Sequence, residues 1–375
     1  MQPSLTLRAD VNSDSQQISL FDAWLAPTSR DHSRTLEVYD ALPKFSLGRE
    51  RESTKNLREW NNVAIGNNRV VRVTMSAAIL KTSALPGDPD GEVQGRVIFP
   101  GVREELVDKA LRKMAVQRQI ESREDLDELG NRIVFIDFTL FQLRAELSEA
   151  GHDFNTKQLR EALAVLEGCR YSVEGLDQDW LIGKSFPLLY IEYRRKRTDN
   201  DGQQSFYRAT FPAPASRAIL SGAWHPINYG RLMQLRTPLA RWIAERINLA
   251  YRQAEKNASL KRRGYYLYLS RVLAESGIAP EARLRDNAQR VRQALDDLKQ
   301  TGFLSISDAY LEEPIYAKSA NGRGRPTLKD VRWTLYPSNA FAEEIITGNA
   351  AMKKLRERLS ATPAEHQIPA LDSSQ

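Results

Sequence analysis

The sequence predicts an α+β protein in which two similar units follow one another behind a flexible N-terminal arm. Two segments, 137–211 and 238–335, each show apolar residues at helical spacing, followed by strand-like runs around a polar loop. A hydrophobic share of 41% with 27% charged residues is ordinary for a soluble folded protein. We therefore expect an arm over 1–60, a first domain with an N-terminal extension over 61–230, a second domain over 231–350 and a C-terminal tail over 351–375.

The stretch before the first unit predicts a strand, a turn and a helix. The arm itself is rich in Ser, Asp, Asn and Arg, and strand-like patterning begins only after it, at Val70–Thr74. The run Pro86–Gly91 predicts an exposed turn, because Pro and Gly set φ values that neither a helix nor a strand continues. Val102–Gln119 then predicts a helix.

The first unit begins with two predicted helices. One covers Asp137–Ala150 and is ended by Gly151, and the other runs from Asn155 to about Gly168. Leucine residues at helical spacing mark the buried face of each helix. Strand-like runs follow at 171–173, 186–193 and 205–211, and a loop that starts with the basic run 194–197 joins the last two. Helix, turn, helix and β-hairpin in this order predict a winged helix-turn-helix.

The second unit repeats this order of elements with little identity between the residues. Helices are expected at 238–254, 265–276 and 280–300, followed by strands at 303–306, 316–318 and 331–335. The last two strands flank a glycine-rich loop, which forms a second wing with Arg323 and Arg325 at its tip. Beyond Ser360 the chain is polar, and we expect it to be frayed.

The third helix of the second unit has a face suited to reading DNA bases. Its apolar residues lie within about a quarter-turn of one another and form the core face. The opposite face carries Arg283, Arg285, Gln289, Arg290, Arg292 and Gln293. Arginine matches the two major-groove acceptors of guanine, and glutamine matches the donor–acceptor pair of adenine. The alternative is a solvated face whose arginines pair with Asp286, Asp296 and Asp297.

Other basic residues predict weaker or less specific DNA contacts. The second helix of the first unit offers Lys157 and Arg160 on its polar face. The run Arg194, Arg195, Lys196 and Arg197 is interpreted as phosphate contacts, which add affinity and salt dependence but no sequence information. Arg323 and Arg325 suit a narrow minor groove. The alternative for the basic run is a solvated loop.

Charge and composition restrict the classes of function. A net charge of +6 is compatible with nucleic acid as a partner. The single cysteine, Cys169, lies in an apolar helical pattern and is expected to be buried and inert. The four histidines form no metal-ligand spacing, and no Gly-rich phosphate loop is present, so we expect no metal, no cofactor and no enzymatic activity. No apolar run approaches membrane length, and we expect a cytoplasmic protein.

A short peptide in the arm matches a docking motif. It consists of Gln17, Ile18, Ser19, Leu20 and Phe21. A glutamine amide fixes the register of a bound peptide, and a Leu-Phe pair supplies an apolar anchor. Bacterial replication proteins dock on the DNA polymerase sliding clamp through peptides of this kind. The alternative is a short segment packed on the body through its apolar side, with Trp24 and Leu25 included.

Taken together, these features resemble the plasmid replication initiators that bind iterons, most closely those of the TrfA type. The resemblance is carried by Gln17–Asp22, by Phe138–Gly168 and by Leu235–Tyr310, whereas Leu36–Gly95 has no counterpart. It implies that the protein binds double-stranded DNA at repeated origin sites and promotes opening of the origin. It further implies recruitment of the host initiator, the replicative helicase and the sliding clamp, and exchange between monomer and homodimer.

Two other functions remain open from the sequence. A winged-helix transcriptional regulator shares every predicted element, and only the clamp-like peptide argues against it. A strand-nicking replication enzyme would need a His-x-His metal pair beside a nucleophilic tyrosine. Tyr265 and Tyr266 are present, but no such histidine pair accompanies them.

Overall fold

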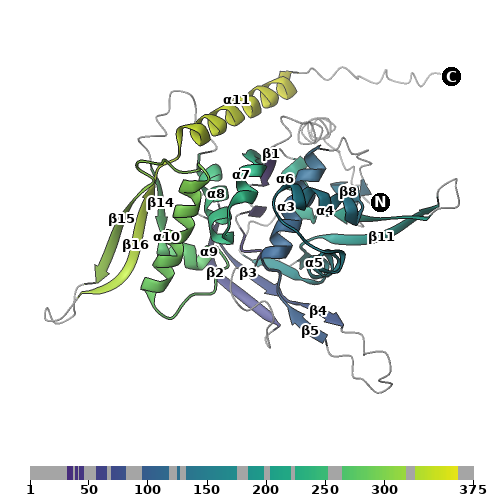
Figure 1. The fold of residues 1–375 in the computed structure, drawn as a ribbon, viewed down its shortest axis with the longest axis horizontal. Coiled ribbons are helices and arrows are strands. Elements are labelled where there is room, and N and C mark those ends of the chain that lie inside the picture. The colour runs from purple at the N-terminus through teal and green to yellow at the C-terminus, as the bar shows by residue number, and fades with distance from the viewer. Residues whose placement is uncertain are drawn as a thin grey trace, which may run out of the picture.

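The protein has an α+β fold, as the sequence predicts, in the computed structural model (Figure 1). The structure describes residues 32–36, 39–40, 42–45, 56–65, 69–81, 95–117, 125–126, 132–174, 185–197, 203–220, 224–251, 264–317 and 326–361. One hydrophobic core contains buried residues from Tyr39 to Met233, and another contains buried residues from Ile227 to Ile345. The two cores correspond to two units, which we define by their elements below.

The first unit extends from α3 to β12. Its elements are α3 (Val102–Gln117), β8 (Phe135–Phe138), α4 (Leu140–Glu149), α5 (Thr156–Gly168), β11 (Tyr190–Arg197) and β12 (Gln203–Thr210). The sheet order is β11-β12-β8, and both pairs are antiparallel. Helices α4 and α5 each begin with a capping box, in which the N-cap residue and the third helical residue exchange hydrogen bonds. The sequence assigned 137 and 138 to a helix, but they end strand β8, because Thr139 caps the helix after them.

The second unit extends from α8 to β16 and has the same order of elements. These are α8 (Pro238–Ala250), β14 (Tyr265–Tyr268), α9 (Leu269–Glu275), α10 (Leu284–Gln300), β15 (Tyr310–Ala317) and β16 (Thr327–Leu335). The sheet order is β14-β16-β15. Two sequence assignments are wrong here. Residues 265–268 form a strand and not the start of a helix, since their aromatic side chains suit a pleated sheet. The expected strand at 303–306 contributes only an isolated bridge between Leu304 and Pro337.

The segment that has no counterpart in the resemblance forms part of a separate sheet. Its strands β2 (Leu57–Ile65) and β3 (Arg69–Ser76) join β9 (Arg170–Glu174) and β10 (Phe186–Pro187) in the order β10-β9-β3-β2. The hairpin β4 (Ala78–Lys81) and β5 (Gly95–Ile98) packs on α5. Strand β2 contacts α9 of the second unit. This segment therefore lies between the two units in space, although it precedes both in sequence (Figure 1).

Part of the stretch assigned to a flexible arm belongs to the folded body. Strand β1 (His32–Leu36) pairs with β13 (Trp224–Asn228), and Tyr39, Leu42 and Phe45 are buried in the first core. The Tyr39 hydroxyl donates a hydrogen bond to the carbonyl of Leu188 at 3.2 Å. These apolar side chains are sparse along a polar stretch of sequence, so periodicity does not reveal their burial.

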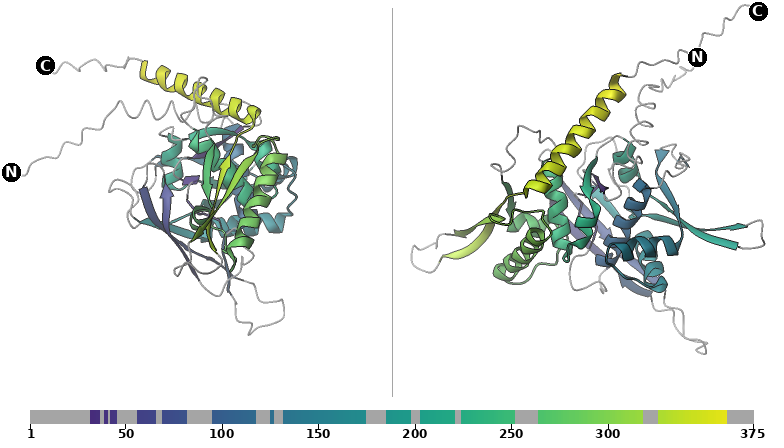
Figure 2. Two further views of the ribbon diagram at one scale, coloured as in Figure 1. Left: turned by 90° about the vertical axis from the view of Figure 1, so that its left-hand side faces the viewer. Right: turned by 45° about the horizontal axis from the view of Figure 1, so that its top comes forward.

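The remaining elements connect the units or flank them. They are β6 (Asp125–Leu126), β7 (Arg132–Ile133), α6 (Ala213–Leu220), α7 (Tyr229–Gln234) and α11 (Asn339–Ala361). Helix α11 begins on the second core through Phe341 and Ile345 and continues away from the body (Figure 2). It extends through residues 351–361, where the sequence assigned a tail.

Helix α3 is buried along most of its length. Residues 104–115 are all buried, although the helix carries many charges. Its buried charged residues are Glu104, Glu105, Asp108, Lys109, Arg112 and Lys113. A helix that is polar on several faces is normally solvated, and burial of charges requires partners. The sequence treats this helix as part of an extension, whereas the structure places it between α4, α5 and the second unit.

Candidate nucleic-acid interface

Helix α10 presents a polar face beside an apolar one. Its buried side includes Ala288, Val291, Leu295 and Leu298. Four of the residues predicted to read DNA are exposed, namely Arg283, Arg285, Gln289 and Gln293. Among the residues that the structure describes, none forms a hydrogen bond or ion pair with the guanidinium group of Arg283 or Arg285. Their guanidinium groups are therefore available to an anionic or hydrogen-bonding partner.

Two further predicted DNA-reading residues have partners within the protein. Arg292 donates hydrogen bonds to the two carboxylate oxygens of Glu312 on β15, at 2.8 and 2.7 Å. The Trp333 ring nitrogen donates to the same carboxylate at 3.0 Å. Arg290 donates to the carbonyl of Ala279 at 2.8 Å and lies 3.5 Å from a carboxylate oxygen of Glu281. The sequence offers Asp286, Asp296 and Asp297 as alternative partners, whereas the carboxylates near these two arginines are those of Glu312 and Glu281.

The Arg292–Glu312 pair is electrostatically stabilised. The hydrogen bonds from Arg292 lower the pKa of Glu312 below its ordinary value, partial burial acts in the opposite direction, and Trp333 adds to the lowering. Because Arg292 lies on α10 and Glu312 on β15, the pair joins the helix to the β-hairpin. Arg292 thus joins two elements in this structure, and the base contact that the sequence predicts for it stays a prediction.

The turn before α10 is organised by Asn287, which the sequence analysis did not single out. Its side-chain oxygen accepts a hydrogen bond from the backbone N–H of Glu281 at 2.8 Å. Its amide nitrogen donates to the carbonyls of Glu281 and Arg283, at 2.9 and 3.1 Å. Asn287 is only 3% exposed, so its amide is committed to this loop. A lone asparagine inside a polar helical run gives no sequence signal for such a role.

The polar face of α5 is smaller. Lys157 and Arg160 are exposed, and no described residue pairs with either side chain. The capping box engages Gln158, whose side chain accepts from the backbone N–H of Asn155 at 2.9 Å. On another side of the helix, Glu161 accepts a hydrogen bond from Arg103 of α3 at 2.8 Å. Helix α5 therefore exposes two cations on a scaffold fixed by α3, and their contact with DNA stays a prediction.

The basic run at 194–197 lies in strand β11 and not in the loop that the sequence predicts. Arg194 donates two hydrogen bonds to the carboxylate of Glu192, at 2.8 and 2.5 Å, which neutralises part of its charge. The side chains of Arg195, Lys196 and Arg197 lie outside the described part of the chain, as do Arg323, Arg325 and the whole peptide Gln17–Phe21.

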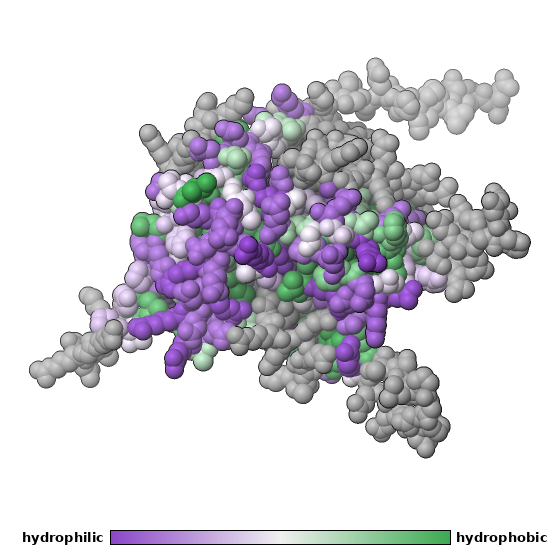
Figure 3. Space-filling view, in the orientation of Figure 1, coloured by the Kyte–Doolittle hydropathy of each residue, from purple (hydrophilic) through white to green (hydrophobic). Residues whose placement is uncertain are grey.

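The two candidate DNA-facing helices share one side of the molecule. Helices α5 and α10 lie toward the viewer in Figure 1, and the two views of Figure 2 agree with this placement. The β-hairpins β11–β12 and β15–β16 project away from each other at the two ends (Figure 1). On this side, hydrophilic residues cover the region of α10 (Figure 3). One continuous ligand could therefore reach both helices.

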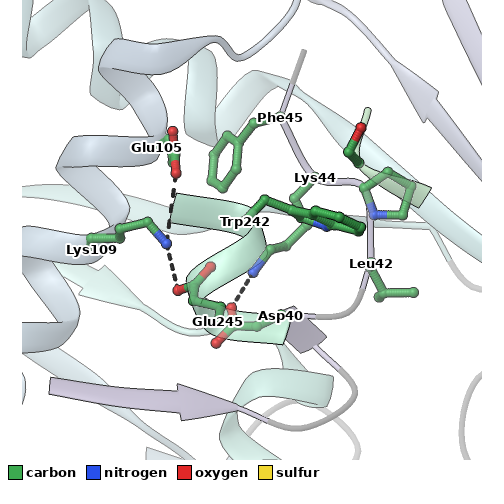
Figure 4. Close-up of a pocket in the computed structure, with 10 residues that line it drawn as sticks. Asp40, Leu42, Lys44, Phe45, Glu105, Lys109, Trp242 and Glu245 are labelled. Carbon is green, nitrogen blue, oxygen red and sulfur yellow. Dashed lines mark hydrogen bonds and ion pairs between the residues drawn. The ribbon is translucent and has the colours of Figure 1, made fainter. Parts of the chain in front are cut away.

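Charged side chains from both units meet between α3 and α8. Glu105, Lys109, Trp242 and Glu245 line a pocket together with residues from the 40–45 segment (Figure 4). Its volume of about 30 Å³ holds a water molecule and no substrate. Burial disfavours the charge of Glu105, but Arg241 and Lys109 outweigh it and keep its pKa below the ordinary value. For Glu245, burial dominates and the pKa is raised.

The described ranges contain neither a membrane-spanning helix nor a metal-binding group of side chains. No helix there is both long enough and apolar enough to cross a bilayer. In those ranges, too, no group of at least three His, Cys, Asp or Glu side chains is arranged to hold a metal ion. Cys169 is buried, and its thiol donates to the carbonyl of Ile98 at 3.6 Å.

No protein-family model and no curated protein matches this sequence. Among solved structures, the chain is similar to a crystal structure of selenomethionine derivatives of domains 2 and 3 of RctB. The two share 10% sequence identity at a TM-score of 0.41, over 80% of this chain and 96% of that chain.

Proposed function

We propose that this protein binds double-stranded DNA in a sequence-specific manner through two winged helix-turn-helix domains. In support, each unit has a helix, a strand, two helices and a two-stranded hairpin in that order. The strand before the helix pair (β8 or β14) joins the sheet beside the second strand of the hairpin (β12 or β16) in both units. In a helix-turn-helix protein the second helix of the pair enters the major groove. That helix is α5 in the first unit and α10 in the second.

The observation that carries the proposal is the exposed polar face of α10. On this face Gln289 accepts a hydrogen bond from Arg292 at 3.1 Å, whereas no described residue pairs with the side chains of Arg283 and Arg285. Arg283 and Arg285 lie at its N-terminal end, and Gln289 and Gln293 follow at helical spacing on exposed positions. Arginine and glutamine are the side chains that recognise guanine and adenine in pairs of hydrogen bonds. The N-terminal residues of a recognition helix are also those that contact base edges.

We further propose that the bound DNA is a plasmid origin with repeated sites and that the protein is a replication initiator without enzymatic activity of its own. This role is supported by the Gln17–Phe21 peptide and by the resemblance of the sequence to iteron-binding initiators. In this reading the DNA-bound body raises the local concentration of the docking peptide at the origin. The sliding clamp, the host initiator and the replicative helicase are then its protein partners.

Footprinting on DNA from both sides of the coding region tests the DNA-binding proposal. We expect protection of direct repeats of about two helical turns each, at a salt concentration where competitor DNA does not bind. Equal binding to all fragments, or binding to none, would overturn it.

Plasmid maintenance separates an initiator from a transcriptional regulator. A plasmid that has the protected region as its only origin should be maintained when the protein is supplied, and lost when it is absent. A regulator would bind the same repeats without supporting replication. Supercoiled origin DNA incubated with the protein and Mg²⁺ should remain supercoiled, whereas relaxation would favour a strand-nicking enzyme.

A further inference from the structure

Two buried ion pairs join the first unit to the second. Arg241 of α8 donates hydrogen bonds to the carboxylate of Glu105 on α3, at 3.0 and 2.8 Å. Lys109 of α3 donates to the carboxylate of Glu245 on α8 at 2.6 Å (Figure 4). Each of these four side chains belongs to a residue that is at most 8% exposed. Helices from different units are therefore held together by charges that are almost completely buried.

The same cluster includes the segment before β2. Arg112 donates to Asp40 at 2.8 Å and to Asp108 at 2.6 Å, and Lys44 donates to Asp40 at 2.6 Å. We call the following eight residues the ionic cluster: Asp40, Lys44, Glu105, Asp108, Lys109, Arg112, Arg241 and Glu245. Its four cations balance its four anions, so the cluster is neutral while it remains assembled.

A neutral buried cluster restricts geometry more than it adds stability. The cost of removing ions from water offsets much of their attraction, so the net gain from such pairs is small. Separation of a pair leaves an uncompensated buried charge, however, and that state is strongly unfavourable. Small changes in the angle between α3 and α8 would separate Arg241 from Glu105. One relative orientation of the two units is thus selected.

The backbone restricts the same boundary. Gly277, which follows α9 in the second unit, has a φ of 77°, and a Cβ atom there would lie 2.5 Å from the carbonyl oxygen of Phe45. The chain before β2 therefore packs directly against the second unit. Contacts between β2 and α9 continue this boundary.

We propose that the ionic cluster makes the two units one rigid body and so holds α5 and α10 at a fixed separation. The protein then accepts only DNA sites in which the two halves have one particular spacing. The spacing requirement rests on the proposed DNA binding, whereas the rigidity does not. Recognition helices on one rigid body meet major grooves on one side of a duplex, which repeat every 10–10.5 base pairs or about 34–36 Å. An insertion of about five base pairs turns one half-site to the opposite side.

Distances between spin labels test the rigidity without DNA. Labels are attached at Glu167→Cys on α5 and Asp296→Cys on α10, both exposed positions, in a Cys169→Ala background. We expect one narrow distance distribution in the full chain. A broad or two-peaked distribution in this otherwise unchanged protein would overturn the proposal, whatever its DNA binding.

A variant without the inter-unit ion pairs shows whether the cluster causes the rigidity. It combines Glu105→Gln, Lys109→Met, Arg241→Met and Glu245→Gln, which keep side-chain volume. The matched control is Asp137→Asn with Arg208→Met, which removes an Arg–carboxylate pair of 2.7 and 2.8 Å within the first unit. The label distribution should broaden in the first variant and stay narrow in the control. An unchanged, folded cluster variant would show that the ion pairs do not set the orientation.

DNA with altered spacing tests the consequence. Once footprinting has located the half-sites, affinities are measured for the natural site and for sites with two or five added base pairs between them. We expect each insertion to weaken binding at least tenfold in the unmodified protein, and less in the cluster variant. Equal affinity for all spacings, with a narrow label distribution, would overturn only the spacing requirement. Absence of any specific DNA site would refute the proposed function. The spin-label distances would still show whether the two units form one rigid body.

Discussion

Arg292 of α10 and Glu312 of β15 form a two-pronged ion pair, with N–O distances of 2.8 and 2.7 Å. The pair ties the candidate recognition helix to the hairpin behind it, and Trp333 completes the site from β16. A polar residue on the exposed side of a helix can therefore hold two elements together, whatever the helix binds.

The Arg292–Glu312 pair should make stability depend on pH. Because the pKa of Glu312 is lowered in the folded state, its contribution is present above the ordinary glutamate pKa and is lost as the pH falls through the folded value. Glu312→Gln should cost about 1 kcal/mol near pH 7, since both partners are partly exposed. Urea unfolding at pH 7 and at pH 4 checks this. A cost that does not shrink at the lower pH would contradict it.

Arg285 and Arg292 should differ in their effects on DNA binding. Arg285→Ala should cost about 1–3 kcal/mol of binding free energy and relax base preference, because Arg285 is free to contact a base. Arg292→Ala should reduce stability more than base preference. Fluorescence anisotropy with the footprinted site and with single-base variants of it measures both effects. Lys354→Ala on α11, also an exposed cation, is the control and should change neither. Equal losses of base preference at 285 and 292 would contradict the assignment.

Asn287 should be important for stability although it contacts no ligand. Asn287→Ala leaves the backbone N–H of Glu281 and two carbonyls without their side-chain partner and should cost about 1–3 kcal/mol. Gln289→Ala, on the exposed face of the same helix, should change stability by less than about 0.5 kcal/mol. Thermal unfolding of the two variants provides the comparison. Similar melting temperatures would show that the loop does not depend on Asn287.

Alanine substitutions at two glycines with similar backbone angles distinguish backbone strain from a steric clash. Gly151 and Gly277 have φ values of 83° and 77°, but a Cβ atom at Gly151 would meet nothing within 4 Å. Gly151→Ala should therefore cost about 1–2 kcal/mol from the left-handed conformation alone. Gly277→Ala should lower the free energy of unfolding by at least about 1 kcal/mol more, because the added methyl group also clashes with the Phe45 carbonyl. If chemical denaturation shows an equal loss of unfolding free energy in the two variants, the chain near Phe45 moves aside at little cost.

The docking peptide should account for any binding to the sliding clamp. Leu20→Ala together with Phe21→Ala removes the apolar anchor and should weaken clamp binding by about 2 kcal/mol or more, while affinity for origin DNA stays unchanged. Surface plasmon resonance with full-length protein and purified clamp measures the first quantity. Absence of clamp binding before the substitution would remove the main support for a replication role.

The sequence by itself determined the features that depend on local spacing. Apolar residues repeated every three or four positions predicted α10 and α5 and the sides that they bury. The α+β class followed from helices and strands that alternate with turn-forming residues. The exposed Lys157, Arg160, Arg283 and Arg285 were predicted because they lie opposite apolar stripes.

Only the tertiary structure decided which charges are free. Arg241 and Glu105 are 136 residues apart, and no periodicity links them. The same holds for Arg292 and Glu312, which meet because a hairpin folds back on a helix. Burial of α3 and of the chain around Tyr39 likewise depends on surfaces supplied by distant elements. The spacing of residue types along the sequence shows which side of a single helix or strand is apolar. A charged side chain is buried only beside a partner, and the partner is brought there by the packing of distant elements.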